Sequence, residues 1–125
     1  MITIRQRGAS DCAVAATAMF LDVSYDEVYK VLPEDTAWRI RMGSGLQNTE
    51  VFDVAYKFGV ILSTRPAIDP GRRALLVVPP KNLPAPNKHM VFWSGTRIHD
   101  PSPLKRYRKV PGSVLYTIQE DLDEE

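Results

Sequence analysis

The sequence has few of the residues that stabilise or catalyse through sulfur and metal chemistry. Its 125 residues include one cysteine, Cys12, so an internal disulfide is excluded. Only two histidines are present, His89 and His99, and a Cys/His zinc site would need carboxylates to complete it. We expect neither a metal nor a cofactor. The thiol of Cys12 is therefore either a buried structural group or a reactive one, and free cysteine is more often the former.

The sequence also lacks a strong charge of either sign and long apolar runs. Its 16 Lys and Arg balance 15 Asp and Glu, and a net charge of +1 argues against nucleic acid or a membrane surface as the main partner. No segment has the length of a membrane span, and residues 1–10 do not form a secretion signal. We expect a cytoplasmic protein with one domain over residues 1–125, in which residues from about 119 to 125 form a frayed acidic tail.

The order of the expected elements indicates the fold class. An Ala-rich helix should follow Asp11, with Ser10 or Asp11 as its cap, and a capping-box pattern at Ser24 predicts a second helix that ends before Pro33. Residues 34–47 look irregular or partly helical. The other expected elements are a helix at 49–58, closed by Gly59, and strands at 60–64, 74–78, 89–93, 96–100 and 114–118. Helices that precede strands predict an α+β fold, with N-terminal helices packed on an antiparallel sheet.

The position of Cys12 favours a reactive thiol. Cys12 falls in the first turn of the expected Ala-rich helix. Unpaired N–H groups and the helix dipole favour negative charge at that end of a helix, and so favour the thiolate. Position alone does not decide between a reactive and a structural cysteine, so a partner residue is needed.

A predicted hairpin supplies that partner. If Ser94 and Gly95 form its two-residue turn, the antiparallel register places His89 directly opposite Asp100. The carboxylate would then orient the imidazole and stabilise its protonated form. His99 is one residue out of step and should point to the other face.

Two segments together resemble a known family. Gln6-Arg7-Gly8-Ala9-Ser10-Asp11-Cys12-Ala13 is similar to the Gln, four variable residues and Asp-Cys-Gly of the bacteriocin-processing cysteine peptidases, and an apolar Ala-rich helix follows in both. His89-Met90-Val91-Phe92 and the later Asp100-Pro101 are similar to the His strand and Asp-Pro of that family. These are papain-like enzymes that remove leader peptides after a double glycine. In this chain Ala13 replaces the glycine that usually follows the nucleophile.

The resemblance implies a papain-like fold and a role for each residue. Cys12 would be the nucleophile, His89 the general base and acid, and Asp100 the orienting carboxylate. Gln6 would donate a hydrogen bond in the oxyanion hole, where it is chemically suited to hold a tetrahedral intermediate together with the Cys12 N–H. We therefore expect a cysteine hydrolase that cleaves a peptide or related amide bond in a peptide or protein substrate.

Other readings remain open at the level of sequence. A catalytically silent relative could use the same cleft to bind peptides or a partner protein. A cysteine acyl transferase or deamidase would use the same residues and differ only in what resolves the thioester. The basic run Lys105-Arg106-Tyr107-Arg108-Lys109 could contact phosphate, although such runs are usually solvated and we do not expect nucleic-acid binding.

Overall fold

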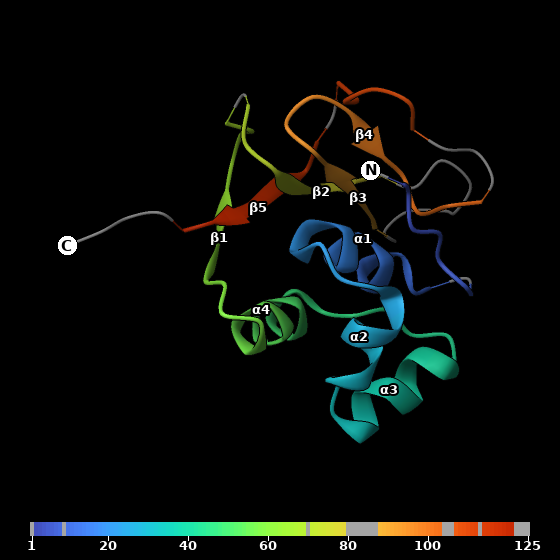
Figure 1. Ribbon diagram of the computed structural model, residues 1–125. Helices are drawn as coiled ribbons and strands as arrows, with labels where there is room; N and C mark the ends of the chain where they lie inside the picture. The colour runs from blue at the N-terminus through green and yellow to red at the C-terminus, as the bar shows by residue number, and fades with distance from the viewer. Residues whose placement is uncertain are drawn as a thin grey trace.

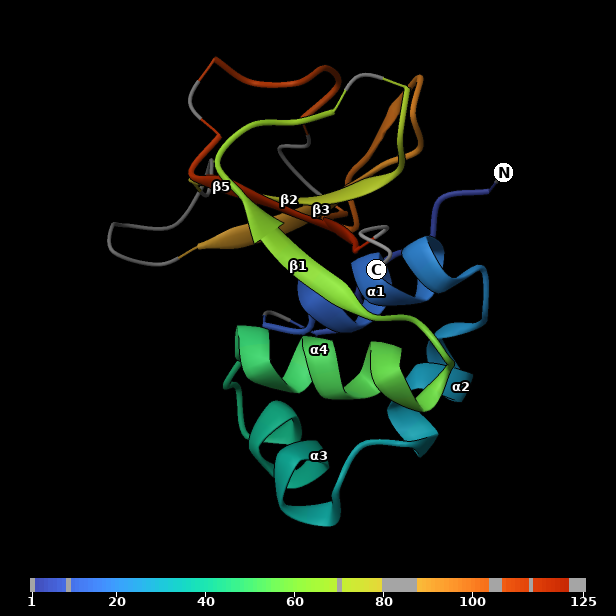
Figure 2. The ribbon, with the colours of Figure 1, turned by 90° about the vertical axis from the view of Figure 1, so that its left-hand side faces the viewer.

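The computed structural model describes residues 2–8, 10–69, 71–79, 88–103, 107–112 and 114–121. Four helices precede five strands within these ranges, and Figures 1 and 2 show the helices on one side of the sheet. The helices are α1 (Cys12–Leu21), α2 (Tyr25–Lys30), α3 (Glu34–Arg41) and α4 (Asn48–Lys57). The strands are β1 (Leu62–Arg65), β2 (Ala74–Val78), β3 (His89–Trp93), β4 (Ile98–His99) and β5 (Tyr116–Glu120). The expected α+β order is confirmed.

The sheet is antiparallel throughout, with strand order β1-β5-β2-β3-β4. Strand β2 lies at its centre and is buried along its whole length, as its uninterrupted apolar sequence Ala-Leu-Leu-Val-Val favours. The edge strand β4 is the shortest and follows the turn after β3. The first residue of β3 and the residue after β4 therefore lie at one end of the same hairpin.

The core lies between α1 and the sheet. Helix α1 is buried from Ala13 to Phe20, because its small alanines let it approach β3 closely. Phe20 meets Phe92 of β3 edge to face, with 6.2 Å between the ring centroids. A ring packed in this geometry contributes about 0.5–1.5 kcal/mol beyond its buried area. This contact fixes the C-terminal end of α1 relative to β3.

The helix boundaries agree with the sequence except in one region. The Ser24 capping box forms, with Glu27 accepting from the Ser24 N–H and donating its own N–H to the Ser24 hydroxyl. Gly59 adopts the expected left-handed conformation, with φ of 82°. Residues 34–41, expected to be irregular or partly helical, form α3, whose Arg39 pairs with Glu50 of α4. This contact with α4 is tertiary, so it left no mark on the local sequence pattern.

The predicted start of the frayed tail, at about residue 119, falls within β5. Gln119 and Glu120 are the last residues of β5, and Gln119 is fully buried. Strand pairing with β1 places them in the sheet, because Ser63 is the partner of Gln119 and Leu62 of Glu120. Residues 122–125 lie outside the described ranges. Among the described residues, no helix has both the length and the apolar character needed to cross a membrane.

Candidate active site

The N-terminal segment joins the helical layer to the β4 end of the sheet. The Ile4 N–H donates to Met19 Sδ of α1, and the Gln6 N–H donates to the Pro101 carbonyl at 2.9 Å. Arg5 donates through its guanidinium to the carbonyl oxygen of Asp100. The segment therefore leads directly from the residues after β4 to the start of α1, where Cys12 lies.

Cys12 is the first residue of α1 and is partly buried. Neither Ser10 nor Asp11 caps the helix with its side chain, which corrects the sequence-based expectation. The Ser10 hydroxyl instead donates to the Gly43 carbonyl. The Val14 N–H donates to the Asp11 carbonyl, and neither side chain takes up the N–H groups of Cys12 and Ala13, which can face a negative charge near Cys12.

Asp11 organises the loop before Cys12. Its carboxylate is only 3% exposed and accepts the N–H groups of Arg7 and Gly8, each at 2.8 Å. It also accepts the Tyr25 hydroxyl of α2 at 2.6 Å. Burial and this hydrogen bond raise the pKa of Tyr25, so the phenol stays a donor at any physiological pH. The loop that contains Gln6 is thus tied to α1 and α2 through one carboxylate.

His89 hydrogen-bonds Asp100 and lines the same cleft as Cys12. Its Nε2 lies 2.7 Å from Asp100 Oδ1, and the Cys12 side chain is near enough to raise the pKa of His89. Burial alone would lower the pKa of His89, but the hydrogen bonds to Asp100 and Cys12 outweigh it and raise the pKa to about 9. A pKa of about 9 keeps the imidazole protonated at neutral pH, and with 14% of its side chain exposed it is still reachable from solvent.

Asp100 is held as a carboxylate. Its side chain is 1% exposed, and burial by itself would raise its pKa. The hydrogen bond from His89 and the N–H groups of Ser102 and Tyr107, at 2.9 and 2.7 Å, instead hold the pKa of Asp100 below its ordinary value. Three donors on one buried carboxylate fix its orientation as well as its charge.

The register that brings His89 to Asp100 differs from the predicted one. Phe92 pairs with His99 and Trp93 with Ile98, so the loop has four residues, closed by the Ser94 N–H to the Arg97 carbonyl at 2.9 Å. The expected two-residue turn is wrong, and His89 is not directly opposite Asp100. A shift of two residues preserves the faces of a strand, so Asp100 stays on the His89 side and reaches it diagonally.

His99 points away from this pair, as expected. Its Nδ1 lies 2.8 Å from the Thr3 hydroxyl, and its ring packs against Phe92 with 5.9 Å between centroids. Burial lowers its pKa first, and the positive charges nearby lower it further. At neutral pH His99 is therefore uncharged, whereas His89 is protonated.

A cleft of about 770 Å³ opens at Cys12 and His89. One wall is the segment from Gly43 to Thr49, and the other comes from β2, β3 and β5 through Val77, Met90 and Tyr116. Asn48 at the start of α4 donates to the hydroxyl of Tyr116 at the start of β5, which joins the two walls. This volume is typical of sites for small ligands or short peptide segments.

The glycines of the cleft wall were not identified as site residues from the sequence. Gly43 has φ of 98°, and a Cβ on Gly45 would lie 3.1 Å from the Ser10 carbonyl oxygen. Both glycines let the backbone approach the start of α1 closely. The Gly-Ser-Gly triplet was a visible signal, but only the tertiary contact with Ser10 shows which wall it forms.

Gln6 lies beside this cleft without lining it. Its Nε2 donates to the Gly8 carbonyl at 2.8 Å, and its Oε1 is buried without a hydrogen-bond partner among the described residues. An amide nitrogen carries two N–H donors, so one remains for another acceptor. Within the described ranges, no three His, Cys, Asp or Glu side chains are grouped so that they could hold a metal ion.

Comparisons with known proteins agree with this architecture. No family model matches the sequence, and no curated protein matches it. A solved structure does match: the double-glycine motif protease of an AMS/PCAT transporter, crystallised in complex with the leader peptide. It is 18% identical, covers 95% of this chain and 89% of its own, and superposes with a TM-score of 0.57. This chain therefore has the papain-like fold of a double-glycine motif protease, with helices first and an antiparallel sheet after them.

Proposed function

We propose that this protein is a cysteine hydrolase that cleaves a peptide or related amide bond, with Cys12 as nucleophile, His89 as general base and acid, and Asp100 as the orienting carboxylate. The observation that supports the proposal is that His89 hydrogen-bonds Asp100 and lines one cleft together with Cys12, which also raises the pKa of His89. The fold shared with a peptidase of this kind supports the same reading.

The reaction follows from the charges of the three residues. The thiolate of Cys12 attacks the carbonyl carbon, and its electron pair forms the C–S bond while the carbonyl oxygen becomes an oxyanion. Protonated His89 gives its proton to the leaving amine, and the C–N bond breaks to leave a thioester. Neutral His89 then takes a proton from water, which attacks the thioester and releases the acid and the Cys12 thiolate.

Gln6 is proposed as the side-chain donor to the oxyanion. Its backbone N–H is bound to the Pro101 carbonyl, and the two residues that follow it are held by the Asp11 carboxylate beside Cys12. The second N–H of its amide, together with the Cys12 backbone N–H, would bind the developing negative charge. One donor of this kind contributes about 10²–10³-fold to the rate in enzymes that use an oxyanion hole.

The proposed substrate is an extended segment of a peptide or protein. The similar protease was crystallised with a leader peptide, and the cleft here is open enough to receive a chain from solvent. Gly43 and Gly45 carry no Cβ and Ser44 has a short side chain, so a substrate backbone can approach this wall closely.

The test is a comparison of new peptide termini. A complex peptide pool is incubated with the native protein, Cys12→Ala, His89→Ala and His99→Gln, and mass spectrometry identifies the products. We expect defined cleavages from the native protein and His99→Gln, and none from Cys12→Ala or His89→Ala. Products in which an added amine replaces water would assign an acyl transferase instead, and an unchanged pool would contradict the hydrolase.

A further inference from the structure

A second cavity, which shares no lining residue with the cleft, lies at Asp100. It has a volume of about 610 Å³, and its lining includes Asp100, whereas the cleft is lined by His89. The groups that matter for its chemistry come from the N-terminal segment, the β3–β4 hairpin and the basic run: Arg5, Trp93, Arg97, His99, Arg108 and Lys109. No local pattern in the sequence connects these residues, because they lie up to about a hundred positions apart.

Positive charge gathers in this cavity without a matching negative charge. Arg97, Arg108 and Lys109 are exposed and make no ion pair with any residue in the described ranges. Arg5 donates to the carbonyl oxygens of Asp100 and Ser102, which leaves its charge uncompensated. Among the described residues of the lining, the one carboxylate belongs to Asp100, and it is buried and already bound by His89.

Two further groups in the lining bear on what the cavity can bind. The indole N–H of Trp93 is buried and has no hydrogen-bond partner among the residues described. A buried donor left unpaired costs about 1–3 kcal/mol, and a ligand acceptor would remove that cost. His99 is held neutral by burial and by the charges of Arg97 and Arg5.

We propose that this cavity binds a small molecule that carries phosphate. Arginine guanidiniums form paired hydrogen bonds with phosphate oxygens, and several cations around one cavity favour a multiply charged group. The volume is within the range of sites that hold small ligands, so an organic part can accompany the phosphate. The near-neutral chain and a local cavity, in place of an extended basic stripe, disfavour nucleic acid as the ligand.

Trp93 offers a direct reporter of binding. Trp38 is the only other tryptophan, and it is exposed, so Trp38→Phe leaves Trp93 as the single indole. Fluorescence of this variant is measured during titration with pyrophosphate, ATP and adenosine at constant ionic strength. The NMR resonance of His99 provides a second signal from the same cavity. We expect saturable changes in both with pyrophosphate or ATP, and none with adenosine.

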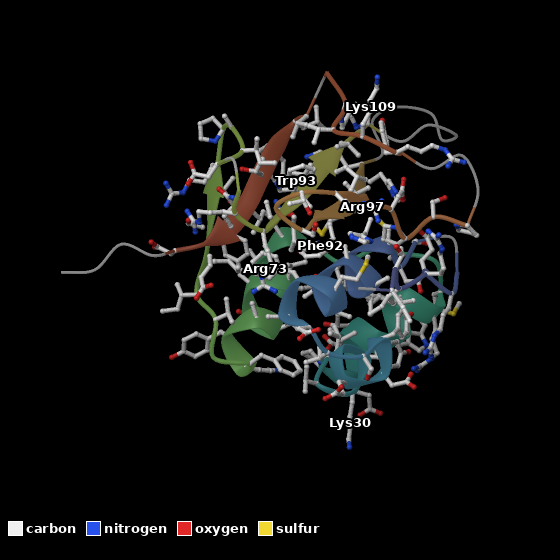
Figure 3. The ribbon with its side chains drawn as sticks, turned by 45° about the horizontal axis from the view of Figure 1, so that its top comes forward. Lys30, Arg73, Phe92, Trp93, Arg97 and Lys109 are labelled. Carbon is white, nitrogen blue, oxygen red and sulfur yellow. The ribbon has the colours of Figure 1, made fainter. Side chains whose placement is uncertain are left out.

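Matched charge removals complete the test. Figure 3 shows Trp93, Arg97 and Lys109 toward one end of the molecule and Lys30 at the opposite end. Lys109→Gln and Arg97→Gln should each weaken binding about tenfold, the effect of losing one charge-assisted contact, whereas Lys30→Gln should leave it unchanged. ATP that binds more tightly than pyrophosphate would assign a nucleotide, and equal affinity would assign the phosphate group alone. Absence of saturation in both signals, or equal weakening by Lys30→Gln, would overturn the proposal.

Discussion

At the scale of single residues, Asp100 governs the charge of His89. Replacing it as Asp100→Asn keeps the size but removes the negative charge that stabilises the imidazolium. We expect kcat/KM to fall by about 10²–10⁴-fold, the range for disabling a general acid and base. Peptide cleavage measured by mass spectrometry tests this, with the exposed Asp53→Asn of α4 as the matched control. Equal activity in the two variants would remove Asp100 from the mechanism.

The raised pKa of His89 predicts a pH dependence. Its pKa is 6.5 in the unfolded chain and about 9 in the folded protein, so the imidazolium stabilises the fold fully below pH 6.5, and this contribution is lost as pH rises through 9. The proton needed by the leaving amine is lost over the same upper range. We expect kcat/KM to fall above about pH 9. A rate that keeps rising past pH 10 would show that protonated His89 is not required.

Asp11 predicts a structural effect on the site. Asp11→Asn puts an amide N–H against one of the three donors that the carboxylate now accepts, so the free energy of unfolding should fall by about 1–3 kcal/mol. Asp26→Asn removes a carboxylate that pairs with Arg7 on the surface. This variant should change the free energy of unfolding by less than about 0.5 kcal/mol. Urea unfolding of both variants measures the difference. Similar losses in the free energy of unfolding for the two variants would show that the Asp11 hydrogen bonds stabilise the protein no more than a surface ion pair does.

At the scale of elements, the hydrogen bond between Asn48 and Tyr116 joins α4 to β5 across the cleft. Tyr116→Phe and Asn48→Ala should each destabilise the protein, and a double-mutant cycle should give a coupling energy of about 0.5–1.5 kcal/mol. Tyr56→Phe, which alters an exposed tyrosine of α4, is the control and should show no coupling to Asn48→Ala. A coupling energy near zero for Asn48 and Tyr116 would mean that this hydrogen bond does not hold the two walls together in solution.

The same scale shows what could be predicted from the sequence. Helix α1 and strand β2 were predictable because their burial leaves a continuous apolar pattern. The β3–β4 register was not, since a two-residue turn and a four-residue loop both fit the pattern and differ by a shift that keeps every side chain on its face. For that reason the predicted contact of His89 with Asp100 is present although the predicted register was wrong.

The candidate site could be predicted only in part. Cys12, His89 and Asp100 carried local signals: a helix start, a strand start and an Asp-Pro after a strand. The contacts of Asp11 with Arg7, Gly8 and Tyr25, and those of Ser10 with Gly43, depend on how separate segments meet. Local sequence patterns do not encode such tertiary contacts, so the walls of the cleft could be identified only in the structure.

At the scale of the whole molecule, the site joins two layers. Cys12 belongs to the helices and His89 to the sheet, and the contact of Phe20 with Phe92 holds α1 on β3. Figure 1 shows these two layers of helices and strands. The N-terminal segment and Asp11 fix the loop next to Cys12 from outside this core. The contact of Cys12 with His89 therefore depends on the packing of the helical layer against the sheet, and its formation reports on the fold as well as on the chemistry.

The rate of Cys12 alkylation as a function of pH, in the native protein and in His89→Ala, tests the central claim most directly. A thiolate held by protonated His89 should react fast well below about pH 8.5, where an isolated thiol ionises, and the reaction should lose this low-pH phase in His89→Ala. His99→Gln should keep it. A single ionisation near pH 8.5, identical in the native protein and His89→Ala, would contradict a catalytic pair of Cys12 and His89.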